Sequence, residues 1–130
     1  FELHLFGPAT DSYPSAQGVH GHGFVDALSD VWECVDCMVQ PVRSGAGINI
    51  KVAETIYNGL PMVGTPLSTR GLPLEPDDAI ILCDEPAEWV DFFASECLTD
   101  FLRSTPRPLN RALFSANGAI EKLRALLHTA

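Results

Sequence analysis

Positive charge is scarce in this sequence. Its 130 residues include 8 lysines and arginines against 17 aspartates and glutamates, which gives a net charge of −9, and the basic residues form no cluster. A surface that binds nucleic acid or an anionic membrane concentrates Lys and Arg on one face. The composition therefore argues against nucleic acid or an anionic membrane as a partner, while a neutral ligand or a locally bound anionic one stays open.

Long hydrophobic runs are also lacking. Apolar stretches such as residues 79–83 are far shorter than the about 20 residues of a membrane-spanning helix. The sequence begins at Phe1 without the basic and then apolar segments of a secretion signal. We expect no direct membrane span and a cytoplasmic location, with peripheral attachment at the inner face of the membrane, through other parts of the chain, left open. The four cysteines stand in apolar contexts, which predicts buried, reduced thiols rather than a disulfide framework.

The chain does contain alternating strand and helix patterns, and its 46% hydrophobic content suits one core. Period-2 or short apolar runs predict strands at residues 1–6, 18–25, 37–40, 60–65 and 79–83. Helix patterns and stop signals predict helices after an Asp26 N-cap and at residues 48–58, 86–98 and 120–127. This alternation predicts an α/β fold, with a Rossmann-like parallel sheet covered by helices on both faces.

Small residues stand just ahead of the second predicted helix: Gly45, Ala46 and Gly47. In a doubly wound sheet, ligands bind beyond the carboxyl ends of the strands, where the N-terminus of a helix attracts anions. Small side chains would let a diphosphate approach the backbone closely. The N–H groups of Gly47, Ile48 and Asn49 would then point at it.

A polar stripe is expected along this helix, at the spacing i, i+3, i+4 and i+7, from Lys51, Glu54, Thr55 and Asn58. It is expected opposite the apolar Ile48, Val52 and Ile56. At 1.5 Å per residue, the backbone of Glu54 would lie about 10 Å from Gly47, so Glu54 could reach a ribose attached to a diphosphate at the loop. The alternative is a glycine turn without a ligand and a solvated face with a Lys51–Glu54 ion pair worth about 0.2–0.5 kcal/mol.

Other polar groupings are weaker candidates for chemistry. His20 and His22 have no third ligand beside them in the sequence, and such pairs are more often strand or turn residues than metal ligands. The C-x-x-C spacing at residues 34–37 joins a helix end to a strand and has no second pair. We therefore expect neither a metal site nor a redox centre, and we expect the adjacent Asp77 and Asp78 to be solvated.

Four pieces of the sequence occur in a specific order. They are a turn with Gly23, Val25 and Asp26, an aspartate-strand-proline segment at residues 36–41, a Gly-x-Gly-x-x-x-Lys-x-x-Glu run at residues 45–54, and a Gly-x-Pro-x-Val-x-Thr strand at residues 59–65 followed by Arg70-Gly71-Leu72. This order resembles the C-terminal, donor-binding domain of GT-B glycosyltransferases of the glycosyl transferase group 1 type. The resemblance covers roughly residues 18–98.

The resemblance implies roles for individual residues. In that family a carboxylate at the position of Glu54 typically holds the ribose hydroxyls of the nucleotide sugar, and N–H groups of the preceding loop contact phosphate and sugar. Phe24 and Val25 would line the nucleobase pocket, with core packing as the alternative. Many members carry a further glutamate at the position of Ala46. The implied donor-binding residues are Gly45, Ala46, Gly47, Ile48, Asn49, Lys51, Glu54, Phe24 and Val25.

The resemblance also implies a function. Residues 1–130 would be part of the nucleotide-sugar-binding domain of a retaining glycosyltransferase, which transfers a sugar from a nucleotide-diphosphate donor to a saccharide or lipid-linked acceptor without a further cofactor. The acceptor domain and the first strand of a sheet ordered 3-2-1-4-5-6 would precede Phe1. No residue is implied as the catalytic nucleophile or base. A catalytically silent GT-B-like binding module and a GT-B-fold nucleotide-sugar epimerase stay open as alternatives.

Overall fold

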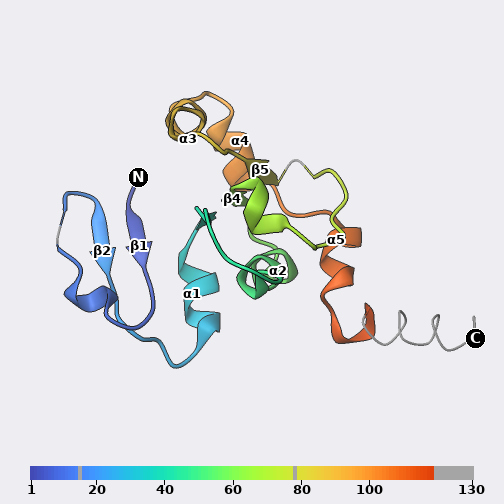
Figure 1. Cartoon of the computed structure of the whole chain (residues 1–130), viewed down its shortest axis with the longest axis horizontal. Helices are drawn as coiled ribbons and strands as arrows, with labels where there is room; N and C mark the ends of the chain where they lie inside the picture. Colours follow the sequence, from blue (N-terminus) through green and yellow to red (C-terminus); the bar gives the residue numbers. More distant parts are fainter. Residues whose placement is uncertain (15, 78, 119–130) are drawn as a thin grey trace, which may run out of the picture. The chain divides into compact units, whose positions relative to one another are not determined.

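A computed structural model describes residues 1–14, 16–77 and 79–118. The helix predicted at residues 120–127 lies outside the described residues. The chain divides into two compact units, Phe1–Cys34 and Val35–Ala130, and each is described by itself (Figure 1).

The described residues of the first unit form two parallel strands and one α-helix. Strand β1 (Leu3–Leu5) pairs with β2 (Val19–Gly21), and the link between them carries the short 3-10 helix η1 (Thr10–Ser12). The strand predicted at residues 1–6 is confirmed at its centre, and the strand predicted at residues 18–25 is confirmed only in its first half, because β2 ends at Gly21. Helix α1 (Leu28–Cys34) follows, so the predicted Asp26 N-cap is wrong because the helix begins two residues further on.

The second unit is built on a parallel sheet of three strands. These are β3 (Met38–Gln40), β4 (Met62–Gly64) and β5 (Ile80–Leu82), with β4 in the centre. All three lie within the predicted strands. Strand β4 is fully buried because both its faces and both its edges are covered.

Helices cover both faces of this sheet (Figure 1). Met62 of β4 packs against α2 (Ile50–Asn58), and Phe114 next to α5 (Pro108–Leu113) joins the same cluster. The next residue, Val63, packs on the other face against α3 (Pro86–Phe93) and α4 (Leu98–Arg103), because successive strand residues point to opposite faces. The predicted α/β, Rossmann-like sheet is thereby confirmed.

One predicted helix is divided in two. Instead of one helix over residues 86–98, α3 ends at Phe93 and α4 starts at Leu98. The Ser95 hydroxyl donates a hydrogen bond of 2.7 Å to the Phe92 carbonyl, a local bond that competes with continuation of the helix. No helix within the described ranges has the length and hydrophobicity needed to cross a membrane.

The strand neighbours agree with the expected order. In the order 3-2-1-4-5-6, the second and third strands are neighbours, as are the fourth, fifth and sixth. The observed pairings β1-β2 and β3-β4-β5 contain the same neighbours. The expected absence of a first strand from this chain stays a prediction.

Candidate functional site

The loop of residues 41–49 joins β3 to α2 and lies at the carboxyl end of the three-stranded sheet. Its anchors come from the residues that follow each strand. Thr65, after β4, donates from Oγ1 to the Val42 carbonyl at 2.5 Å. Nη2 of Arg43 donates to the carbonyl of Asp84, after β5, at 2.7 Å. The loop therefore lies where ligands bind in open parallel sheets.

Two glycines determine the path of this loop. Gly45 has φ +139° and Gly47 has φ +88°, backbone conformations that L side chains rarely adopt. A Cβ at either glycine would meet no heavy atom within 4 Å. Glycine is thus required at both positions by the positive φ angle and not by a lack of room for a side chain. The space beside both glycines is open.

Asn49 is the N-cap of α2. Its Oδ1 accepts a hydrogen bond from Lys51 N at 3.2 Å, and its Nδ2 donates to Gln40 Oε1 at 3.3 Å. The helix therefore begins at Ile50, two residues later than predicted, because the Asn49 side chain replaces the missing helical acceptor. The Asn49 side chain is thus engaged within the protein through Oδ1 and one of the two N–H groups of Nδ2, while its backbone N–H donates to no acceptor among the described residues.

Several backbone donors at this end of α2 have no acceptor. Within the described part of the chain, the N–H groups of Gly47, Ile48, Asn49 and Ile50 donate no hydrogen bond. Such groups carry the partial positive charge of the N-terminus of a helix. An anion in the open space by Gly47 would find donors there, as the sequence predicts; direct contact with phosphate stays a prediction.

The predicted polar stripe on α2 is wrong in part. Thr55 is fully buried, because its hydroxyl donates to the Lys51 carbonyl at 2.7 Å and so needs no water. Ile48, expected on the buried face, is 59% exposed. The exposed Lys51 and the half-buried Glu54 form no ion pair among the described residues, so the alternative of a Lys51–Glu54 pair is also wrong.

Phe24 and Val25 belong to the first unit. Phe24 is 73% exposed and Val25 is half-buried. Core packing therefore does not explain Phe24. That Phe24 and Val25 line a nucleobase pocket stays a prediction.

Two arginines at or beside the loop, Arg43 and Arg70, are not among the donor-binding residues predicted from the sequence. Arg70 follows the 3-10 helix η2 (Pro66–Thr69) and donates from Nη2 to the Gly45 carbonyl at 3.0 Å. Together with Arg43 and Lys51 it makes three basic residues at or beside the loop, and no other Lys or Arg precedes Arg103. In a chain of net charge −9, the presence of these three basic residues near the loop is visible in the sequence and indicates a locally positive region.

The histidines of the first unit interact with one another. His4 and His20 are opposite in the β1–β2 register, with ring centroids 5.0 Å apart, and His4 Nδ1 lies 2.8 Å from His22 Nε2. In the described ranges no group of three His, Cys, Asp or Glu side chains is arranged to hold a metal ion. The close nitrogens of His4 and His22 are satisfied by their own hydrogen bond.

Asp77 has a structural role, so the prediction that it is simply solvated is wrong. Its Oδ2 accepts hydrogen bonds from Arg107 N at 2.6 Å and Asn110 Nδ2 at 2.9 Å, and its Oδ1 accepts from Ala79 N at 3.0 Å. Burial alone would raise the pKa of Asp77, but these hydrogen bonds and the charge of Arg107 outweigh it and hold the pKa below its usual value. Asp78 lies outside the described residues.

The cysteines are all free thiols. Cys83 is buried as predicted, but Cys34 and Cys97 are exposed, which the apolar sequence context did not indicate. Burial raises the pKa of Cys37 to about 11, more than its hydrogen bond with Val63 lowers it, so this thiol stays protonated at neutral pH. Cys37, the second cysteine of the C-x-x-C spacing, is therefore a poor nucleophile.

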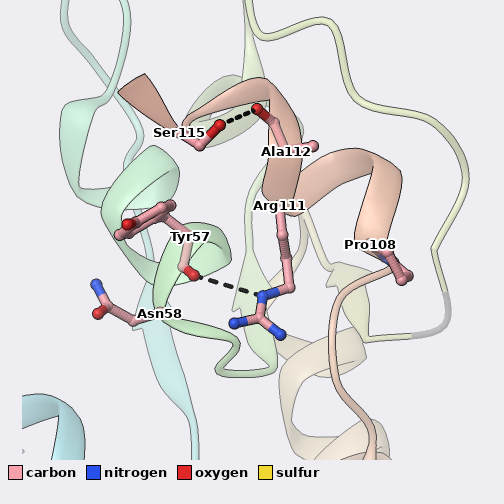
Figure 2. Close-up of a pocket in the computed structure, with 6 residues that line it drawn as sticks. All are labelled: Tyr57, Asn58, Pro108, Arg111, Ala112 and Ser115. Atoms are coloured by element: carbon pink, nitrogen blue, oxygen red, sulfur yellow. Dashed lines mark hydrogen bonds between the residues drawn. The ribbon is translucent and has the colours of Figure 1, made fainter. Parts of the chain in front are cut away.

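A separate, open pocket of about 490 Å³ lies at the other end of α2, beside α5. It is lined by Tyr57, Asn58, Pro108, Arg111, Ala112 and Ser115 (Figure 2). Arg111 reaches from α5 and donates from Nε to the Tyr57 carbonyl at 3.4 Å. Carbonyl groups at the C-terminus of a helix carry partial negative charge, so this pocket suits a diphosphate less well than the loop at the N-terminus of α2 does.

The relationship of the chain to known proteins agrees with this arrangement. Residues 1–97 match the family described as glycosyl transferases group 1. No curated protein and no solved structure matches the chain. The family match covers most of the chain, and the parallel sheet with helices on both faces fits the same family. The chain therefore belongs to the glycosyl transferases group 1, as a GT-B glycosyltransferase domain with an α/β, Rossmann-like fold.

Proposed function

We propose that this chain binds the donor of a retaining glycosyltransferase. The donor is a nucleotide-diphosphate sugar, and its diphosphate lies against the Gly45–Gly47 loop and the N-terminus of α2. The carboxylate of Glu54 accepts hydrogen bonds from the ribose hydroxyls. The acceptor is a saccharide or a lipid-linked saccharide bound by another part of the protein.

The observation that carries the proposal is that the backbone N–H groups from Gly47 to Ile50 have no acceptor among the described residues and that the space beside Gly47 is open. During transfer, the bond between the anomeric carbon and the diphosphate oxygen breaks, and the leaving diphosphate gains negative charge. Donors that are already oriented toward that charge stabilise it without reorganisation. Lys51 and Arg70 add positive charge beside the loop.

A titration of the intact protein tests the proposal. A library of nucleotide-diphosphate sugars is screened by thermal shift, and the donors that raise the melting temperature are titrated by calorimetry. We expect one donor class to bind and its sugar to be transferred with the anomeric configuration of the donor, as read by NMR. Inversion of that configuration would contradict a retaining mechanism, and absence of binding by every donor would contradict the donor site.

A second candidate is a GT-B-like binding module without transferase activity. It is favoured by Ala46, which stands where many members of the family carry a glutamate. Without that carboxylate, contact with the transferred sugar depends on backbone groups. Nucleotide binding without product formation, over the acceptors tested, would favour this candidate.

A further inference from the structure

Arg70 contacts the loop from a different part of the chain. It lies 25 positions after Gly45 in the sequence, and its Nη2 donates to the Gly45 carbonyl at 3.0 Å. The next residue, Gly71, lies against the other end of the loop, since a Cβ placed on it would be 3.5 Å from Ile48 Cγ1. The turn after η2 therefore contacts Gly45 at the start of the glycine segment and passes close to Ile48, which follows its end.

The middle of the loop has little other support. Its ends are fixed through Val42, which accepts from Thr65, through the Arg43 side chain, which donates to the Asp84 carbonyl, and through Asn49, which donates to Gln40. Between them, among the described residues, the bond from Arg70 is the one hydrogen bond to the backbone of residues 43–48. Glycines add conformational freedom to a chain, so a loop held only at its ends would sample many shapes.

The positive charge of Arg70 is not neutralised by a carboxylate. The Arg70 side chain is exposed, and no ion pair within the described ranges includes it. A guanidinium group has five N–H donors in a planar fork, and one bond to Gly45 leaves the others for a second acceptor. Such a fork matches the oxygens of a phosphate.

We infer that Arg70 binds the diphosphate of the donor while it holds Gly45 in place. The inference rests on the proposed function and extends it, because it names one side chain that both orders the loop and contacts the negatively charged ligand. The guanidinium donates at the same time to the Gly45 carbonyl and to a phosphate oxygen. Anion binding and loop order are then coupled through one side chain.

Three variants of the intact protein separate these two contributions. Arg70→Gln retains a donor for the Gly45 carbonyl but has no charge, Arg70→Lys retains the charge but not the planar fork, and Arg70→Ala has neither. Arg103→Gln is the matched control, because Arg103 is an exposed arginine at the end of α4. The probes are UDP, GDP, ADP and their nucleosides, together with inorganic pyrophosphate.

We expect Arg70→Gln to weaken binding of the preferred nucleoside diphosphate, and of pyrophosphate, at least tenfold, as the loss of a charge-assisted hydrogen bond predicts. Affinity for the nucleoside should not change, and the salt dependence of diphosphate binding should decrease. Arg70→Lys should fall between wild type and Arg70→Gln, Arg70→Ala should be weakest, and Arg103→Gln should equal wild type.

The outcomes separate the inference about Arg70 from the proposed donor site. If wild type binds a nucleoside diphosphate and Arg70→Gln binds it equally well, the inference about Arg70 is wrong and the proposed donor site survives. An equal loss for nucleoside and diphosphate would assign Arg70 to loop structure alone, which also overturns the inference. If wild type binds none of the probes, both the proposed function and the inference fail.

Discussion

The proposed role of Glu54 predicts that truncation of its side chain weakens donor binding without changing the stability of the fold. Its side chain forms no ion pair within the described part of the chain, so truncation should leave the fold intact. If the carboxylate accepts hydrogen bonds from both ribose hydroxyls, each charge-assisted bond contributes about 1.5–3 kcal/mol. Glu54→Ala should therefore weaken donor binding at least tenfold, as measured by calorimetry, at an unchanged melting temperature.

A modified ligand provides the control for Glu54. The 2′,3′-dideoxyribose analogue of the nucleoside diphosphate lacks the hydroxyls that Glu54 is proposed to hold. Wild type and Glu54→Ala should bind this analogue with nearly equal affinity. A comparable loss for both ligands would show that Glu54 does not contact the ribose.

Asp77 predicts an effect on stability that depends on pH. Its three hydrogen bonds to Ala79, Arg107 and Asn110 connect the start of β5 to α5, and Asp77→Ala should lower the free energy of unfolding by about 1–3 kcal/mol at pH 7. Because the pKa of the folded carboxyl is lowered, the stabilisation is full above the unfolded pKa of about 3.9 and is lost as the pH falls through the folded pKa.

Urea unfolding of wild type and Asp77→Ala between pH 7 and pH 3 measures this effect. The difference in the free energy of unfolding should be constant down to about pH 5 and should shrink below about pH 4. Asp91→Ala, on the exposed side of α3, serves as a surface aspartate control. A difference that stays constant down to pH 3 would mean that the Asp77 charge does not stabilise the fold.

At the scale of elements, the loop and the N-terminus of α2 act together. Gly47 needs a positive φ, yet it has open space for a side chain, so conformation and bulk can be tested separately. Asparagine tolerates the left-handed region better than other L residues, whereas valine does not. Gly47→Asn should therefore keep a melting temperature near that of wild type and lose donor affinity, while Gly47→Val should lose both.

Thermal denaturation and donor titration of the two variants separate the effects. If Gly47→Asn binds the donor as tightly as wild type does, the phosphate does not occupy the space beside this glycine. A melting temperature of Gly47→Val equal to that of wild type would show that the loop does not need its left-handed backbone.

The elements themselves were largely predictable from the sequence, because strands and helices have different hydrophobic periods. Strand β4, Met62–Gly64, lies inside the predicted range 60–65, and α2 ends at Asn58 with Gly59 as its C-cap, as the stop signals predict. Side-chain hydrogen bonds were not predictable in the same way. Thr55 is buried because its hydroxyl donates to the Lys51 carbonyl. In the sequence, a threonine with such an internal partner is not distinguishable from a solvated threonine.

The candidate site was predictable where neighbours in sequence form it, and not where distant residues do. The Gly45–Gly47 segment and its position before a helix follow from consecutive residues. The Arg70–Gly45 hydrogen bond joins residues 25 positions apart, and nothing in the local pattern indicates it. Asp77 was misjudged for the same reason, since its partners Arg107 and Asn110 are far along the chain.

At the scale of the whole molecule, the two units differ in how much apolar surface they bury. In the described part of the first unit, Val31 is the one buried hydrophobic side chain, and Leu3 of β1 is 43% exposed. The second unit has clusters on both faces of β4. Because burial of apolar surface is the main stabilising contribution, the β1–β2 pair should open more easily than β4.

Native-state hydrogen exchange measures this difference. In the intact protein, amide protons of β1 and β2 should exchange at least tenfold faster than those of β4, since local opening exposes them without global unfolding. We also expect the segment of residues 1–130, expressed by itself, to aggregate. Equal protection in both strand groups would mean that the two units unfold together, and a sharp cooperative melt of a monomer would contradict the expected aggregation.

The distribution of thiols has a practical consequence for measuring motion. One exposed cysteine lies in each unit, Cys34 at the end of α1 and Cys97 just before α4. Burial raises the pKa of both other thiols, Cys37 and Cys83, and the protonated form is a poor nucleophile. A maleimide spin label at neutral pH should therefore attach to the natural sequence once in each unit. Pulsed electron paramagnetic resonance between labels at Cys34 and Cys97 would then follow the distance between these two residues as a nucleotide sugar binds.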